Sequence, residues 1–273
     1  MIDFMNFFDK YRKDIIIDGT PYIDELLNYL NSIGESELLK EHIPTLTIKI
    51  PDLTEEEKRR KRYADGSYNA STNTITIYNT ETIYHELAHV ASYKDQTTRG
   101  VIVPSIKTDE EIEEMIRQGK DDNDFIVGKS FNEGFCDYLA SKIDPNYQLR
   151  YPLEKLIVDK LIDKFGNEPL IYFLKADYQS FHKFINTNNL NSLLSNLDNI
   201  TNLYEKAKSN QEDAETFYNS YYSIMNDNLK ELCSEEEIKE LEDNFFSTSI
   251  GVETNKFLYD QEVKKINKKE DTI

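Results

Sequence analysis

The chain has 273 residues, which is enough to bury a sizeable hydrophobic core in one large domain or in two intimate lobes. Its 51 acidic and 32 basic residues give a net charge of −19, so its surface repels the phosphates of nucleic acids and of anionic membranes, and neither is an expected partner. The two cysteines do not indicate a disulfide scaffold.

The N-terminal segment shows no basic leader followed by a long apolar run, and the chain has no apolar stretch of about 18 residues. We therefore expect a cytoplasmic protein without a membrane partner. The many Lys, Asn, Ile and Tyr residues and the absence of tryptophan indicate an AT-rich bacterial genome. No feature of the sequence indicates an oligomeric state.

The first half of the chain combines helices with a small sheet. A helical pattern with a regular apolar stripe runs through residues 1–35. Residues 45–50 alternate in polarity and predict a strand that ends at Pro51, and a second strand is predicted at 74–78. We expect these strands to form part of a small twisted sheet packed against a helix at about 80–95.

Two charged segments each allow two interpretations. The basic cluster at 59–62 suggests a nucleic-acid patch, but acidic residues four positions earlier can pair with it, which favours a solvated helix. Between residues 96 and 128 a helix is predicted at 108–119. The acidic residues at 121–124 are interpreted as a solvated loop in preference to a second cation site.

After Asp144-Pro145 the predicted structure is nearly all helical. We predict the α+β class, mostly α, with one lobe at 1–145 that carries the sheet and a helical lobe at 146–273, or one integrated domain. The predicted helices of the second lobe are 152–165, 168–175, 178–187, 190–208, 212–231, 234–246 and 255–268.

The segment His85-Glu86-Leu87-Ala88-His89 is the most informative part of the chain. Histidines four positions apart project from one face of a helix and can bind one metal ion. Zinc accepts imidazole nitrogen and favours four ligands, one of which can be water, and Glu86 is placed to act as general base toward that water. Such a pattern also arises by chance, but the chain has only four histidines, and the apolar residues around this pair suit a buried helix.

A second predicted helix, around residues 130–140, supplies carboxylates. Glu133 and Asp137 are four positions apart and share a face of that helix. We predict that Glu133 is the third metal ligand and that Asp137 accepts the free ring N–H of a ligating histidine. Alternatively, Glu133 completes a capping box with Ser130 and only satisfies the helix start. The Cys136 thiolate is a less favoured ligand, because it points about 60° away from the face of the two carboxylates.

Together these residues resemble the gluzincin metallopeptidases, which combine His-Glu-x-x-His with a glutamate on a later helix. Residues 131–135 are similar to the Asn-Glu-Gly-Phe ligand segment of the zinc aminopeptidases, and the Glu133–Asp137 pair is similar to the Asn-Glu-x-x-x-Asp segment of thermolysin-like enzymes. Asn69-Ala70 leads into the predicted strand at 74–78, and together they resemble the thermolysin edge strand, whose Asn-Ala backbone pairs with extended peptide substrate. The resemblance covers about residues 68–140.

The chain also departs from these families. The gap from His89 to Glu133 is 133 − 89 = 44 residues, longer than in either family. No Gly-x-Met-Glu-Asn segment precedes the histidine pair, so the amine-binding device of the aminopeptidases is missing and we expect an endopeptidase. No third histidine follows at the metzincin spacing, which excludes that class.

The resemblance implies a zincin-like core, one Zn²⁺ ion held by His85, His89 and Glu133, and hydrolysis of a peptide or protein substrate with Glu86 as base. A further donor is expected to stabilise the oxyanion, and His182 and Tyr151 are candidates for it. Two other functions are left open. One is a regulatory protease dedicated to a single protein partner. The other is a non-catalytic, zinc-stabilised helical binding module, against which Glu86 argues because structural zinc needs no base.

Overall fold

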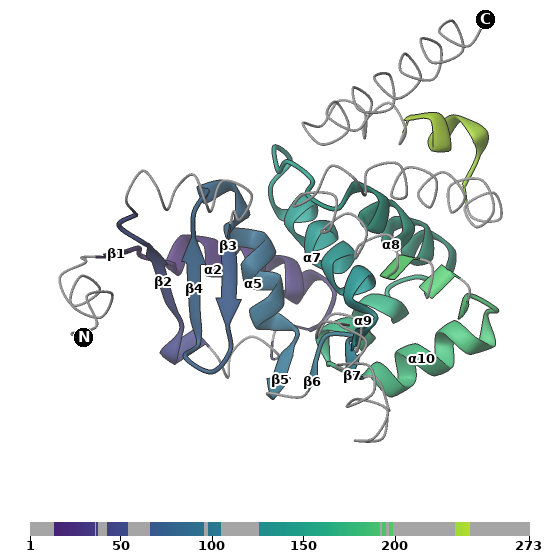
Figure 1. The fold of residues 1–273 in the computed structure, drawn as a ribbon, viewed down its shortest axis with the longest axis horizontal. Coiled ribbons are helices and arrows are strands. Elements are labelled where there is room, and N and C mark those ends of the chain that lie inside the picture. Colours follow the sequence, from purple (N-terminus) through teal and green to yellow (C-terminus); the bar gives the residue numbers. More distant parts are fainter. Residues whose placement is uncertain are drawn as a thin grey trace, which may run out of the picture. The chain divides into compact units, whose positions relative to one another are not determined.

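The structure is a computed structural model, and Figure 1 shows its ribbon. It describes residues 14–35, 37, 43–53, 66–95, 98–104, 126–191, 193, 194, 197, 198 and 233–240. Several predicted features lie outside these residues: the basic cluster at 59–62, the helix at 108–119, the acidic residues at 121–124, and the helices at 212–231 and 255–268.

A mixed sheet of four short strands lies in the N-terminal part of the chain, in the order β1-β2-β4-β3. β2 and β4 pair in parallel, while β1 pairs with β2 and β3 pairs with β4 in the antiparallel sense. β3 is therefore an edge strand of this sheet. The strands are β1 (Ile15–Ile16), β2 (Thr47–Ile50), β3 (Gly66–Asn69) and β4 (Thr74–Ile77).

Alternation of side chains explains why the two predicted strands form. In β4, Ile75 and Ile77 are buried while the threonines between them are not, and Ile48 of β2 pairs in register with Ile75. Successive residues of a strand point to opposite faces, so these isoleucines build one apolar face. The strands predicted at 45–50 and 74–78 correspond to β2 and β4, and β3 was not predicted. β1 corrects the helical prediction for 1–35, because residues 15–16 pair with β2 as a strand and the helix begins only at Thr20.

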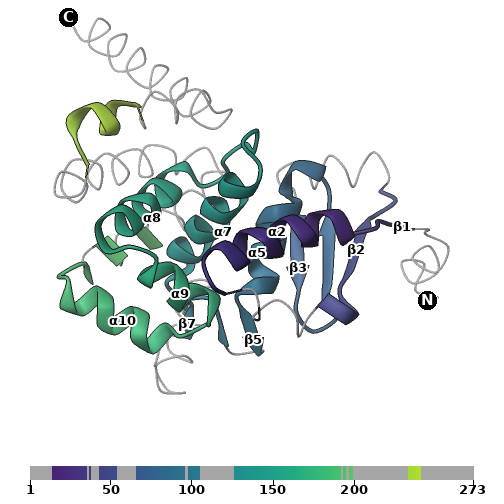
Figure 2. The ribbon, with the colours of Figure 1, turned by 180° about the vertical axis from the view of Figure 1, so that it is seen from behind.

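Two helices cover the apolar side chains of the sheet. α2 (Thr20–Ser32) buries Leu26 and Leu30 completely, and α5 (Ile83–Ala91) contacts α2, β3 and β4 (Figure 2). A short 3-10 turn, η2 (Thr80–Thr82), leads into α5, and the Asn79 side chain accepts a hydrogen bond from the backbone N–H of Glu81 at that turn. Because α5 is buried on nearly all sides, its polar residues are enclosed with it.

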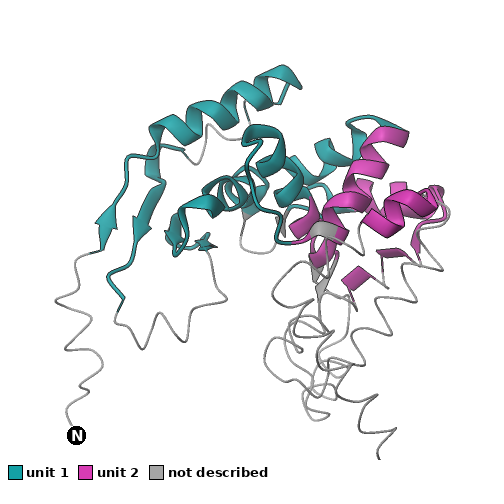
Figure 3. Cartoon of the chain, turned by 90° about the horizontal axis from the view of Figure 1, so that it is seen from above, with its two compact units in different colours: residues 1–101, 135–150, 165–178 teal, residues 102–134, 151–164, 179–273 magenta. Residues whose placement is uncertain are grey.

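The chain divides into two compact units, which are coloured in Figure 3. Unit 1 comprises residues 1–101, 135–150 and 165–178, and unit 2 comprises 102–134, 151–164 and 179–273. The units are interleaved along the chain, whereas the predicted lobes at 1–145 and 146–273 are consecutive. One of the boundaries falls within a helix, α7 (Lys129–Ile143), whose first turns belong to unit 2 and whose remainder belongs to unit 1.

The remaining described elements include three α-helices, which agree with the predicted helices at 152–165, 168–175 and 178–187. The mostly helical α+β class is thereby confirmed, and α5 ends at Ala91, a few residues before the predicted end. None of the described helices combines the length and the apolarity that crossing a bilayer requires. These elements are η1 (Ile43–Thr45), the β5–β6 pair (Tyr93–Asp95, Thr98–Arg99), the β7–β8 pair (Val103–Pro104, Ile126–Val127), α8 (Pro152–Phe165), α9 (Glu168–Leu174) and α10 (Tyr178–Thr187).

The first turn of α7 is capped from outside the helix. The buried carboxylate of Asp198 accepts hydrogen bonds from the backbone N–H of Gly128 at 2.7 Å and of Ser130 at 3.0 Å. Ser130 itself lies within the helix, and its hydroxyl donates to the Leu197 carbonyl. Ser130 is therefore not the N-cap residue that a capping box with Glu133 requires, so the main alternative role for that glutamate loses its basis.

We expect Asp198→Ala to lower the free energy of unfolding by about 2 kcal/mol, because two buried N–H groups of the helix start lose their acceptor. Urea unfolding followed by circular dichroism measures this loss. Asp163→Ala, at an exposed carboxylate on α8, is the matched control. Equal losses in the two variants would show that Asp198 does not cap α7.

Candidate metal centre

α5 places the two histidines of the motif on one buried face. His85 is buried and His89 is half-buried, and their ring centroids lie 5.0 Å apart at an interplanar angle of 76°. The four-residue spacing on a helix accounts for this proximity. Because the helix is packed against the sheet and α2, contacts within the protein hold both rings in place.

The Asp137 carboxylate holds the ring of His85. It is fully buried on α7, and its Oδ1 lies 2.8 Å from His85 Nδ1 and accepts a hydrogen bond from the Tyr147 hydroxyl at 2.6 Å. Its Oδ2 accepts from the backbone N–H of Arg150 at 2.7 Å. Since an ionised carboxylate only accepts, His85 Nδ1 carries the proton and Nε2 keeps the lone pair that a metal needs. The contact predicted between Asp137 and a histidine of the motif is thus present.

Tyr147 is a member of this network that the sequence analysis missed. It is buried, and its hydroxyl also lies 3.3 Å from His85 Nδ1. Burial raises the pKa of Tyr147 well above its ordinary value, and the adjacent Asp137 charge raises it further, so the phenol stays a donor. A turn after α7, in which Tyr147 N–H donates to the Asp144 carbonyl, brings it back to the helix. The sequence Asp144-Pro145 indicated that turn, but among 18 tyrosines nothing marked this one.

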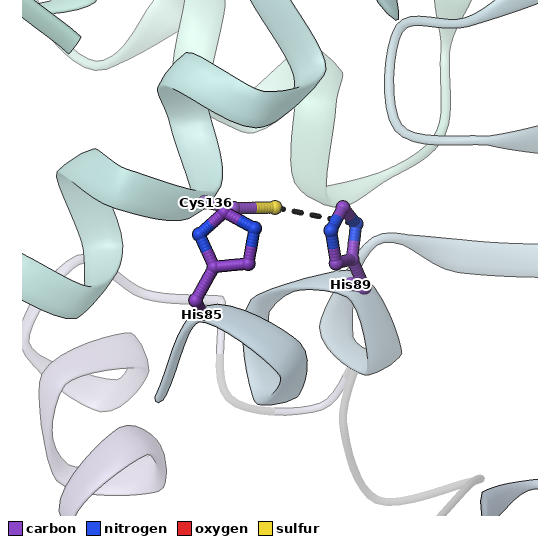
Figure 4. A group of neighbouring side chains, drawn as sticks. All are labelled: His85, His89 and Cys136. Carbon is purple, nitrogen blue, oxygen red and sulfur yellow. Dashed lines mark hydrogen bonds between the residues drawn. The ribbon is translucent and has the colours of Figure 1, made fainter. Parts of the chain in front are cut away.

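Cys136, which was expected to lie about 60° from the face of the two carboxylates and to be a less favoured ligand, also reaches the histidines. Its Sγ lies 3.3 Å from His89 Nδ1 (Figure 4). His85, His89 and Cys136 each offer one ligand atom within 4.8 Å of the others, so this cluster could hold a metal ion. Neighbouring residues of a helix are about 100° apart, and α7 lies over α5 so that Asp137 meets His85 while Cys136 meets His89.

Glu86 is buried against the edge strand of the sheet. Only 6% of its surface is exposed, and a Cβ added at Gly66 of β3 would lie 2.7 Å from Glu86 Oε1 and 2.9 Å from Thr82 Oγ1. No larger residue fits at position 66 without displacing these atoms, which is why a glycine begins this strand. The backbone of β3 thus passes directly beside the carboxylate that follows the first histidine.

The other predicted site residues belong to unit 2. Glu133 is half-buried on the first turns of α7, and its ligation of the metal stays a prediction, as do the roles of Tyr151 and His182. Burial lowers the pKa of His182, and its Nε2 has no hydrogen-bond partner within the described part of the chain. These properties are typical of a neutral structural histidine packed beside Phe181.

Comparison of the chain with protein-family models, with curated proteins and with solved structures finds no match. The candidate site is therefore argued from its own residues and contacts. Those contacts join α5, α7 and the following turn within unit 1.

Gly66→Ala tests the packing of Glu86. We expect a loss of about 1–3 kcal/mol in the free energy of unfolding, because the added methyl group overlaps the carboxylate. The loss is expected to be smaller in a Glu86→Ala background, where the overlapping oxygen is gone, with a coupling energy of at least about 0.5 kcal/mol. Additive losses in a double-mutant cycle of thermal or urea unfolding would contradict the contact.

Tyr147→Phe tests the hydroxyl that donates to Asp137. Hydrogen bonds to charged groups stabilise proteins by about 1.5–3 kcal/mol, so we expect a loss of that size in urea unfolding. Tyr178→Phe, at a half-buried tyrosine that begins α10, provides the same chemical change away from the Asp137 network and is expected to cost less. If both variants unfold alike, the Tyr147 hydroxyl does not support Asp137.

Proposed function

We propose that this chain is a zinc-dependent endopeptidase with a gluzincin-like, zincin-type core, in which His85 and His89 ligate the ion and Glu86 is the general base. Asp137 fixes the proton of His85 on Nδ1, which leaves the other ring nitrogen as the donor that zinc ordinarily takes. Imidazole donors in a buried site favour zinc over the hard cations magnesium and calcium. Glu133 is the proposed third ligand, on the strength of the sequence resemblance.

The burial of Glu86 is the observation that carries this proposal. A carboxylate is costly to bury, and it is kept where its charge has a use. A zinc ion that only stabilises a fold needs four ligands and no base. General-base catalysis requires a carboxylate within hydrogen-bond reach of the attacking water, and Glu86 stands next to a proposed metal ligand on the same helix.

When bound, zinc supplies a Lewis acid that polarises a carbonyl group and acidifies water. The residues of the chain then move the proton. Glu86 takes a proton from the attacking water and delivers it to the nitrogen of the leaving amine, so that one carboxylate serves both halves of the reaction. Asp137 and Tyr147 hold His85 in one tautomer throughout, because neither the carboxylate nor the phenol has to change its protonation state.

β3 is the element best suited to hold an extended peptide. As an edge strand it pairs only with β4 among the described strands, and an edge offers backbone N–H and C=O groups to a further strand. Gly66 brings this backbone beside Glu86, with no side chain between them. A peptide paired along β3 would therefore pass close to the base. The strand at 74–78, to which the sequence resemblance assigned the substrate-binding edge, is β4 and lies between β2 and β3.

A second function is favoured by one specific observation. The Cys136 sulfur belongs to the cluster with both histidines, and structural zinc sites are built from cysteine and histidine donors. In that case the chain would be a non-catalytic, zinc-stabilised module that binds a protein partner.

Glu86→Gln separates these functions. We expect the purified variant to retain zinc, as measured by elemental analysis, but to cleave a peptide library at least 100-fold more slowly than the wild type, because the amide cannot accept the proton. Glu81→Gln, at an exposed glutamate on η2, is the matched control and is expected to keep full activity. Stoichiometric zinc without cleavage by the wild type would favour the binding module, and absence of zinc would remove both functions.

A further inference from the structure

Both histidines of the motif turn the same ring atom toward α7. His85 Nδ1 meets Asp137 Oδ1 at 2.8 Å, and His89 Nδ1 meets Cys136 Sγ at 3.3 Å. The two partners are consecutive residues of one helix. Cys136 is fully buried, as Asp137 is, so neither contact is diluted by water. The two contacts are equivalent in geometry, because each joins a histidine Nδ1 to α7, although one partner is a carboxylate and the other is a sulfur.

We propose that Cys136 is a positioning residue for His89 and not a ligand of the metal. This inference rests on the proposed zinc site. In it, His89 Nδ1–H donates a hydrogen bond to Cys136 Sγ, which orients the imidazole and keeps the lone pair on Nε2. Cys136 thus does for the second histidine what Asp137 does for the first.

The geometry of the imidazole ring favours this role over direct ligation. Both histidines project from one face of α5. Nδ1 of His85 already contacts Asp137, and Nδ1 of His89 already contacts Cys136. An ion shared by the pair is therefore reached through Nε2 of both rings. The two nitrogens of an imidazole point in different directions, so a sulfur in contact with Nδ1 does not also lie at the Zn–S bonding distance of about 2.3 Å from an ion on Nε2.

The two roles make opposite demands on the side chain at position 136. A positioning residue needs only a compact acceptor, which the hydroxyl of serine also provides. A ligand needs a thiolate, for which serine is a poor substitute toward zinc or cobalt. Valine has no acceptor and is somewhat larger than cysteine, so it removes the hydrogen bond without leaving a cavity.

The experiment uses the full chain, stripped of metal with a chelator and titrated with Co²⁺. For the wild type we expect visible d–d bands without an intense sulfur-to-cobalt charge-transfer band in the near ultraviolet. Cys136→Val is expected to bind Co²⁺ about tenfold more weakly, whereas Cys136→Ser is expected to stay within about threefold of the wild type. Cys233→Ser removes the other thiol, which is not a member of the cluster, and is expected to change neither spectrum nor affinity.

Each remaining outcome overturns the inference in a distinguishable way. A charge-transfer band in the wild type that persists in Cys233→Ser and disappears in Cys136→Ser would make Cys136 a ligand, while leaving the zinc site in place. Wild-type affinity in Cys136→Val, with a thermal unfolding midpoint equal to that of Cys136→Ser, would show that the sulfur contact is idle. Failure of the wild type to bind cobalt or zinc would remove the metal site itself, and the proposed function with it.

Discussion

The candidate site depends on one buried carboxylate. Asp137 is fully buried, and its two oxygens accept hydrogen bonds from the His85 ring, the Tyr147 hydroxyl and the Arg150 backbone. A buried charge is tolerated only when donors replace the water that it has lost, and each bond to a charged acceptor stabilises the fold by about 1.5–3 kcal/mol. Loss of any donor would leave part of that charge uncompensated, which couples α5, α7 and the turn after α7.

This coupling has a consequence for chemistry. A histidine can bind a metal only through a nitrogen that carries no proton, and in a free imidazole either nitrogen can carry it. By accepting from Nδ1 of His85, Asp137 settles that choice before any ion arrives. Cys136, the α7 residue before Asp137, contacts Nδ1 of His89, so two consecutive residues of one helix contact both rings. The protein therefore orients both histidine rings without a metal ion.

The edge strand β3 adds a second constraint, because the backbone at Gly66 closely approaches Glu86 and Thr82. A glycine there lets a sheet edge and a buried carboxylate lie side by side, although glycine is a poor strand former. The loss of strand propensity is offset by pairing with β4 along the whole strand. At Gly66 the low strand propensity of glycine conflicts with its place in β3, and such conflicts are common at functional sites.

Hydrophobic period and residue type were enough to predict much of this protein. The alternating isoleucines predicted β2 and β4, the helical patterns predicted α8 to α10, and the four-residue spacing predicted that His85 and His89 lie together. These features are local, and each is set by which residues share a face. What the local pattern lacked was the pairing partner that makes strands of β1 and β3, and the Asp198 carboxylate that caps α7 from far along the chain. Cys136 and Tyr147 entered the site for the same reason, since the rotation of α7 against α5 and the return of the chain after it are decided by packing between segments distant in sequence.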